Sequence, residues 1–105
     1  MRSPFSDTPL DLDDARRLSL AVRTLADPSR LQILNMLHRA DGELTLTELT
    51  SGLGRMNQSS TSYHVSRLVD SGFVSRRQRG VFVYHRLLPA GIAAVVAALS
   101  PGGEQ

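Results

Sequence analysis

The 105-residue sequence contains no cysteine, no tryptophan and no lysine. The missing cysteine excludes disulfides, thiolate metal ligands and a cysteine nucleophile, and it leaves the redox compartment open. No apolar run approaches the ~20 residues that a membrane helix needs. The opening stretch MRSPFSDTPLDLDD lacks the apolar core of a signal peptide, so we expect a cytoplasmic protein that does not associate with membranes.

Positive charge is modest overall but concentrated in one segment. The net charge is +2, and residues 1–54 carry eight acidic residues against six arginines. Residues 55–86 carry six arginines against one acid, Asp70, which gives this segment a net charge of +5. Such a concentration is typical of a surface that binds nucleic acid, because contacts to phosphates supply much of the affinity.

The first half of the chain carries two helical patterns. A first helix is predicted from Leu10 to Ala26, with aspartates at 11, 13 and 14 in its first turns. DPSRLQILNMLHRADG predicts a second helix, with Asp27 as the N-cap and Pro28 at the first helical position. This helix would end at Asp41-Gly42. Its expected buried residues are Leu31, Ile33, Leu34 and Leu37.

A closely spaced pair of helices follows. GELTLTELTSGLG predicts a short extended piece and then a short helix, in which Thr45 and Glu48 have the spacing of a capping box. RMNQSS is a turn, and Asn57 is placed to cap a helix from Gln58 to about Ser71. Apolar and polar positions separate on this helix, with Thr61, Val65 and Leu68 on the side expected to be buried.

The remaining elements are a hairpin and a last helix. FVSRRQ and VFVYHRLL flank Arg79-Gly80, which predicts a β-hairpin between Phe73 and Leu88 with a two-residue turn. PAGIAAVVAALS predicts a helix that begins near Pro89 and carries no charged residue. The fold class is therefore mainly α (α+β), a winged helix-turn-helix in the order helix, helix, short strand, helix, helix, hairpin, helix. We expect this domain over residues 10–100, between flexible tails at 1–9 and 101–105.

The first and last helices carry apolar stripes with two interpretations. One is packing within the domain. The other is a subunit seam, which we favour because the last helix is terminal, uncharged and rich in alanine. The predicted seam residues are Leu18, Val22, Leu25, Ile92, Val95, Val96 and Leu99.

Three stretches together resemble the ArsR/SmtB family of bacterial winged-helix transcription factors: LADPSRLQILNML, LTLTELTSGL and NQSSTSYHVSRLVDSGFVSRRQRGVFVYHRL. The resemblance covers about Leu25 to Leu88. It implies a homodimer joined through the first and last helices, and a recognition helix from Gln58 to Ser71. With the basic hairpin, the predicted DNA contacts are Gln58, Ser59, Ser60, Ser62, Tyr63, Arg67, Arg76, Arg77 and Arg79. The family often has a basic residue where this chain has Tyr63.

The predicted contacts also have plainer explanations. The serines could form an N-cap and a solvent-facing surface, and the arginines of the hairpin could be a charged sheet edge that prevents strand pairing. The density of arginine with no acid nearby in the hairpin favours DNA contact instead.

Many members of the resembled family release DNA when they bind metal. One family site uses cysteines where this chain has LTLTEL, and another uses acidic residues and histidine where it has AGIAAVVAAL. Neither site can be built from these residues, so no cofactor is predicted. Of the three histidines, His38, His64 and His85, we expect His64 to be structural or close to DNA. A non-standard nickel or zinc site that uses His85 or the acidic N-terminus stays open.

The functional hypothesis is a dimeric, sequence-specific transcriptional regulator of the repressor type, associated with the nucleoid when bound. Its partner would be an operator in double-stranded DNA, arranged as an inverted repeat. A winged-helix module whose hairpin binds an acidic protein is the alternative, and an effector or partner protein stays unidentified. An enzyme is not expected, because no nucleophile–base pair, carboxylate pair or phosphate-binding glycine loop is visible.

Overall fold

The computed structural model describes residues 9–99. The elements are α2 (Leu12–Leu25), α3 (Pro28–Ala40), β1 (Glu43–Thr45), α4 (Leu46–Leu53), α5 (Gln58–Asp70), β2 (Val74–Arg79), β3 (Phe82–Leu87) and α6 (Pro89–Leu99). This order confirms the predicted winged helix-turn-helix. Apart from Pro9, the predicted tails lie outside the described residues, so the domain bounds stay a prediction.

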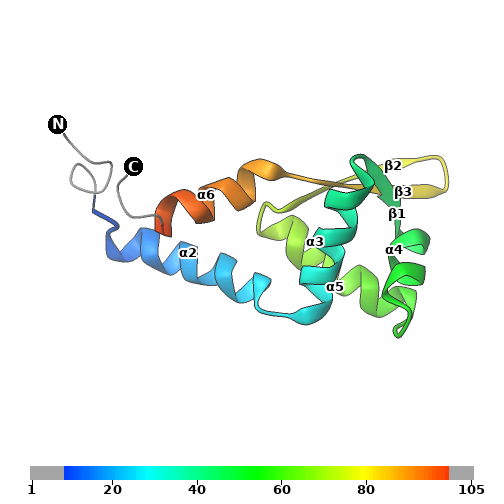
Figure 1. The fold of residues 1–105 in the computed structure, drawn as a ribbon, viewed down its shortest axis with the longest axis horizontal. Helices are drawn as coiled ribbons and strands as arrows, with labels where there is room; N and C mark the ends of the chain where they lie inside the picture. The colour runs from blue at the N-terminus through cyan, green and yellow to red at the C-terminus, as the bar shows by residue number, and fades with distance from the viewer. Residues whose placement is uncertain (1–8, 100–105) are drawn as a thin grey trace.

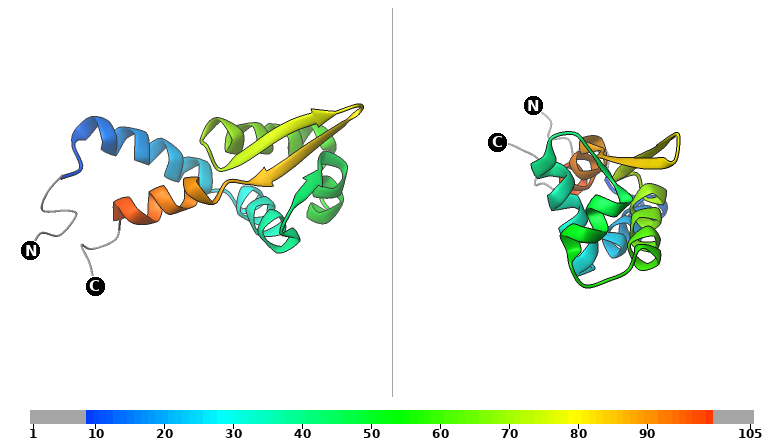
Figure 2. Two further views of the ribbon diagram at one scale, coloured as in Figure 1. Left: turned by 90° about the horizontal axis from the view of Figure 1, so that it is seen from above. Right: turned by 90° about the vertical axis from the view of Figure 1, so that its right-hand side faces the viewer.

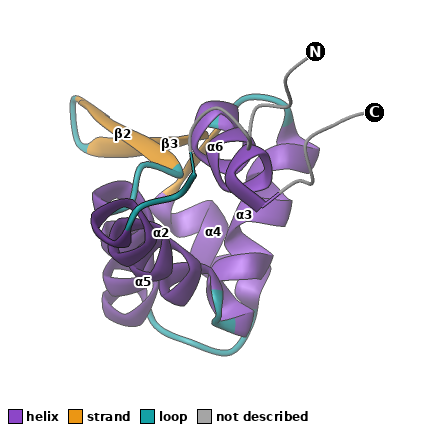
Figure 3. Ribbon diagram, turned by 90° about the vertical axis from the view of Figure 1, so that its left-hand side faces the viewer, coloured by secondary structure: helices purple, strands orange, loops and turns teal. Residues whose placement is uncertain are grey.

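The elements form a body with an extension (Figure 1). The body contains α3, α4, α5 and the sheet, while α2 and α6 lie side by side and extend away from it. The hairpin of β2 and β3 projects from the body on the side of α5 (Figures 2 and 3). Across residues 9–99, no helix combines the length and the apolar character needed to cross a bilayer.

The helices of the body begin at residues that bind their free amides. Asp27 accepts hydrogen bonds from two amides in the first turn of α3, at 2.8 and 3.1 Å, and Pro28 follows it. Thr45 and Glu48 form the predicted capping box of α4, and Asn57 caps α5. These caps confirm the predictions, because each satisfies donors that the helix itself leaves free.

The first helix is shorter than predicted. It begins at Leu12 rather than Leu10 and ends at Leu25 rather than Ala26. Asp11, expected in the first turn, is the N-cap, where its carboxylate accepts a hydrogen bond from the amide of Asp14 at 2.8 Å. A short carboxylate can reach back to such an amide from the cap position, which fixes where the helix starts.

The hydrophobic core lies between α3, α4, α5 and the sheet. The expected burial of Thr61, Val65 and Leu68 on α5 is confirmed. The expected burial of Leu31 is wrong, since 52% of this residue is exposed. Residues two apart on a helix point in nearly opposite directions, so Leu31 faces away when Ile33 is buried. The buried hydrophobic residues are Ile33, Leu34, Leu37, Leu49, Leu53, Val65, Leu68, Phe73 and Val74.

The sheet is antiparallel, with β3 between β1 and β2. Arg79 pairs with Phe82, so the turn of the hairpin is Gly80-Val81 and not the predicted Arg79-Gly80. Gly80 has a φ of 61°, and a two-residue turn with a positive φ at its first central position favours glycine there. Arg79 is therefore the last residue of β2 and not part of the turn.

The start of α6 packs directly against backbone. A Cβ added to Gly91 would lie 2.3 Å from the carbonyl oxygen of Gly72 and 3.1 Å from the ring of Phe73. Gly72 lies in the turn between α5 and β2. Because no larger side chain fits at Gly91, α6 rests on the segment in which α5 ends.

Candidate nucleic-acid interface

The helix α5 presents a polar surface opposite its buried side. Tyr63 is 59% exposed in the middle of this surface, and Arg67 is exposed one turn later. Ser62 is half-buried beside the hairpin. Hydroxyl, amide and guanidinium groups can all bind base edges or phosphates. The exposed members of the predicted contact set on this helix are Gln58, Ser59, Ser60, Tyr63 and Arg67.

Side-chain hydrogen bonds connect the start of α5 to α4, and the turn before it to α3. The amide nitrogen of Gln58 donates to the hydroxyl of Thr47 at 2.9 Å. In the turn between the helices, Arg55 points inward, and its Nη2 donates to the hydroxyl of Ser29 at 2.7 Å. Gln58 therefore stands at the N-terminal end of α5 with its side chain bonded to a neighbouring helix, and Arg55 bonds across the turn.

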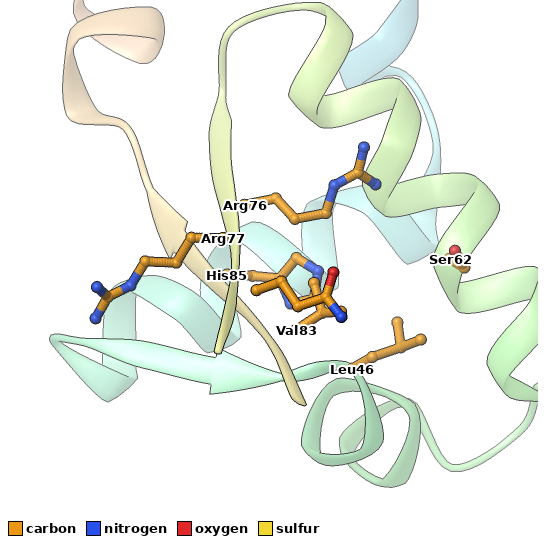
Figure 4. Close-up of a pocket in the computed structure, with 7 residues that line it drawn as sticks. Leu46, Ser62, Arg76, Arg77, Val83 and His85 are labelled. Carbon is orange, nitrogen blue, oxygen red and sulfur yellow. The ribbon is translucent and has the colours of Figure 1, made fainter. Parts of the chain in front are cut away.

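The hairpin turns one set of side chains toward α5. Arg76 and Arg77 point to opposite sides of β2 (Figure 4). Arg76 points toward α5, and its Nη1 donates to the hydroxyl of Ser66 at 3.1 Å. An open cleft of about 340 Å³ lies between the hairpin and α5, and its lining includes Ser62, Arg76 and Gln78. A guanidinium beside hydroxyl groups in such a cleft can bind a phosphate.

The other side of the hairpin carries Arg77 and Arg79. Arg77 forms two hydrogen bonds with Glu43 of β1, from Nε to Oε2 at 2.8 Å and from Nη2 to Oε1 at 2.9 Å. The hairpin sequence itself contains no acidic residue, as expected. The fold nevertheless places Glu43 of β1 beside Arg77, so the expectation that no acid lies near these arginines is wrong. The guanidinium carbon of Arg79 lies 4.5 Å from the centroid of the Tyr84 ring, a cation–π contact.

The arginine–glutamate pair changes the ionisation of both partners. The hydrogen bond from Arg77 is the main reason that the pKa of the Glu43 carboxyl lies below its usual value. Desolvation opposes this effect, and the charges of Arg77, Arg86 and Arg79 add to it. The same bond raises the pKa of Arg77. Both groups are therefore charged across the physiological pH range.

A buried histidine lies at the inner end of the cleft. Only 2% of His85 is exposed, and its Nδ1 donates to the carbonyl oxygen of Leu44 at 3.1 Å. Burial lowers the pKa of His85, the hydrogen bond to Leu44 opposes that effect, and the charge of Arg76 adds to it. The imidazole is therefore neutral at neutral pH.

A second network supports α5 from behind. The Nε of Arg30 donates to Nδ1 of His64 at 3.0 Å, and its Nη1 donates to the carbonyl oxygen of Thr24 at 3.3 Å. Arg30 also lies 5.8 Å from the centroid of the Tyr63 ring. These contacts fit the structural interpretation of His64, one of the two that the sequence left open.

The acid that caps α3 belongs to the same network. Asp27 Oδ1 lies 3.9 Å from Nδ1 of His64. Desolvation acts to raise the pKa of the Asp27 carboxyl, but hydrogen bonds from the amides of Arg30 and Ser29 and the nearby positive groups lower it below its usual value. The cap of α3 and the support of α5 are therefore one connected cluster.

Some of the predicted seam residues pack within their own domain, and others are exposed, as residues of a subunit seam would be in a single chain. Leu25, Ile92 and Val95 are partly buried and pack against the hydrophobic core of the same chain. Val22, Val96 and Leu99 are exposed by 40%, 57% and 64%, while Leu18 is half-buried. Leu12, which the prediction omitted, is 64% exposed on α2.

Sequence reasoning missed several residues that shape this surface. Glu43 and Arg30 each contact a residue 34 positions away, so no local spacing indicated the pairing. Thr47 bonds Gln58 across the helix–turn–helix, and only the predicted packing of the two helices could have suggested it.

Metal-binding residues do not gather in the described part of the chain. No group of three or more histidine, aspartate or glutamate side chains over residues 9–99 is arranged to hold a metal ion. His85, one of the residues left open for such a site, already donates its Nδ1 hydrogen to a backbone carbonyl. The acidic stretch around Asp7 lies partly outside the described residues.

Comparison with known proteins places this geometry in a family. A family of helix-turn-helix domains matches residues 25–77, half of the chain. Among curated relatives, a probable mercury resistance operon repressor of Streptomyces lividans is 45% identical over 58 residues, which are 55% of this chain and 44% of that protein. The chain spans 44% to 60% of the length of three curated relatives that it matches.

Solved structures match over a larger share of the chain. The crystal structure of a possible transcriptional regulator for arsenical resistance is 32% identical, with a TM-score of 0.64, and 77% of each chain is covered. A homodimeric winged helix-turn-helix DNA-binding domain from Mycobacterium bovis, a possible ArsR-family regulator, is 26% identical with a TM-score of 0.67. That match covers 79% of this chain and 75% of the other.

Proposed function

The chain belongs to the ArsR/SmtB family of winged helix-turn-helix transcriptional regulators, and on that premise we propose that it is a homodimeric repressor that binds an operator in double-stranded DNA. It would act in the bacterial cytoplasm and associate with the nucleoid when bound. We further propose an inverted-repeat operator, because a two-fold protein dimer matches a two-fold DNA site.

One observation carries the proposal: the polar surface of α5 and the inner side of the hairpin meet at a common cleft. Arg76 bonds Ser66 of α5 while Ser62 and Gln78 line the space between the two elements. This arrangement places side chains that can read base edges beside a cation that can bind the adjoining phosphate.

The dimer is supported by two independent features. Exposed apolar side chains extend along α2 and α6, the two helices that project from the body. The relative from Mycobacterium bovis, with the same fold, is a homodimer. With both subunits on one face of the duplex, the half-sites would lie about one helical turn apart, ~34–36 Å.

Selection of binding sites from a random duplex pool tests the proposal. The expected result is an enriched inverted repeat that the protein binds more tightly than a scrambled duplex. Gln58→Ala should then change the preferred sequence, with ~1–3 kcal/mol lost for each base contact. Arg76→Ala should weaken binding to all sequences alike and reduce the slope of log affinity against log salt by about one.

Arg39→Ala is the matched control, because Arg39 is an exposed arginine on α3, outside the proposed surface. It should leave sequence preference unchanged. A pool that yields no enriched sequence, with no duplex retained at low salt, would defeat the proposal and favour a protein-binding hairpin instead.

We propose that neither of the family's usual metal sites operates here, since the chain has no cysteine and its last helix has no acidic residue or histidine. An effector at another position would raise the stability of the folded state on binding. Thermal unfolding of the full chain with nickel, zinc and no added metal separates these cases, because only a bound metal raises the Tm.

A further inference from the structure

Glu43 and Arg77 join the two outer strands of the sheet across the central one. Arg77 of β2 lies opposite Tyr84, and Glu43 of β1 lies opposite Arg86, so the pair passes over β3. The two side chains are joined by two hydrogen bonds of 2.8 and 2.9 Å. Paired bonds between a guanidinium and a carboxylate fix the orientation of both groups as well as their distance.

Glu43 also stands close to the start of the helix-turn-helix. Two residues later, Thr45 ends β1 and caps α4. The pair therefore connects the projecting strand β2 to the segment that leads into α4. Only 16% of the Glu43 side chain is exposed, compared with 56% for Arg77, so the carboxylate is the better-fixed end of the connection.

The three arginines of β2 consequently differ in what they can offer to DNA. Arg76 and Arg77 both line the cleft beside α5, but only Arg76 directs its side chain toward α5, whereas the Arg77 side chain points to the other side of β2 (Figure 4). Arg79 lies over an aromatic ring, a contact that leaves its N–H groups free to donate. Arg77 has two of its donors bound to a carboxylate that also cancels its charge locally.

We propose that Arg77 is a positioning residue. Through its bonds to Glu43, it fixes the orientation of the hairpin relative to β1 and the start of α4, while Arg76 and Arg79 make the contacts to phosphate. This inference rests on the proposed DNA-binding function and revises the prediction that all three arginines contact DNA. It assigns Glu43, an acid next to a DNA-facing surface, a favourable effect on binding rather than a repulsive one.

The salt dependence of operator binding separates the two roles. Arg79→Ala should reduce the slope of log affinity against log salt by about one, because one phosphate contact is lost. Arg77→Ala should weaken binding by about threefold or more and leave the slope unchanged. A slope change of about one in Arg77→Ala would overturn the inference, since it would mark Arg77 as a phosphate contact.

Glu43→Gln gives a test with opposite expected signs. If Glu43 positions the hairpin, its loss weakens operator binding even though a negative charge is removed. If Glu43 only withholds Arg77 from phosphate, its loss strengthens binding. The charge-swapped double variant Glu43→Arg with Arg77→Glu should recover wild-type affinity to within about twofold, whereas Arg77→Glu alone should not. If the double variant binds the operator no more tightly than Arg77→Glu alone, the positioning role is contradicted.

Amide hydrogen exchange in β2 provides a measurement that needs no DNA. Glu43→Gln and Arg77→Ala should both speed exchange of the β2 amides, while Arg79→Ala should not. Unchanged exchange in the first two variants would overturn the positioning role even if the wild-type protein binds DNA. Wild-type protein that binds no duplex, but shows the expected exchange, would instead refute the proposed function and leave the connection between the strands intact.

Discussion

Arg30 donates a hydrogen bond to the ring nitrogen of His64 at 3.0 Å and thereby connects α3 to the inner side of α5. The same guanidinium donates to the carbonyl oxygen at the end of α2. One arginine thus links three helices behind the proposed DNA-reading surface. Arginine suits this place because its donors diverge in a fixed plane.

Arg30→Ala should destabilise the fold by about 1–3 kcal/mol, because it leaves two partly buried acceptors without a donor. Urea unfolding of the variant and the wild type gives the difference. Arg39→Ala, an exposed arginine on the same helix, should cost less than about 0.5 kcal/mol. Equal losses in the two variants would show that the network behind α5 adds no stability.

The free energy of unfolding should fall as the solution becomes acidic, because the buried His85 side chain resists protonation in the folded state. Burial lowers the pKa of this imidazole from its usual 6.5, so the unfolded chain takes up a proton before the folded chain does. The stabilisation is complete above pH ~6.5 and is lost as the pH falls toward the lower, folded-state pKa. Urea unfolding between pH 5 and 8 measures the effect.

His85→Asn is the matched variant, because its amide can still donate toward the Leu44 carbonyl but does not titrate. The variant should show a smaller loss of stability between pH 7 and pH 5 than the wild type. His38→Asn, at an exposed site on α3, is the control substitution. If His85→Asn and wild type have the same pH dependence, another group is responsible.

Gly91→Ala should destabilise the protein by about 1–3 kcal/mol, although alanine is the better helix former. The added carbon would meet the backbone oxygen of Gly72, which has no rotamer to change. Thermal unfolding provides the comparison. Ala93→Ser, on an exposed position of the same helix, should leave the Tm nearly unchanged. A stabilised Gly91→Ala protein would contradict the close packing of α6.

Val22→Glu should dissociate the proposed dimer, because a carboxylate would have to be desolvated in an apolar seam. The dimer Kd should rise by more than about tenfold, as sedimentation equilibrium would show. Leu31→Glu is the control, since Leu31 is also an exposed apolar residue but lies on α3. Loss of the dimer in both variants, or in neither, would place the seam elsewhere.

Local sequence signals predicted the elements of this fold well. Asp27-Pro28, the Thr45–Glu48 box and Asn57 each act within one turn, so their effect can be read from neighbouring residues. The errors were also local. Leu31 is apolar but lies on the wrong side of α3, and the hairpin turn was displaced by one residue because both Arg79-Gly80 and Gly80-Val81 contain the required glycine.

The candidate site was predictable in composition but not in connectivity. The hydroxyl cluster of α5 and the arginines of β2 were visible in the sequence, and the structure brings them together at one cleft. The partners of Arg77 and His64 were not visible, because each lies 34 positions away in the chain. Long-range pairing follows from the register of the sheet and the packing of α3 on α5, which no local pattern specifies.

At Gly91, the backbone of α6 packs directly against the backbone of Gly72. Two peptide backbones meet there with no intervening side chain that could absorb displacement. A displacement of α6 toward this contact would therefore push directly on the backbone that follows α5, because no side chain lies between them to change rotamer.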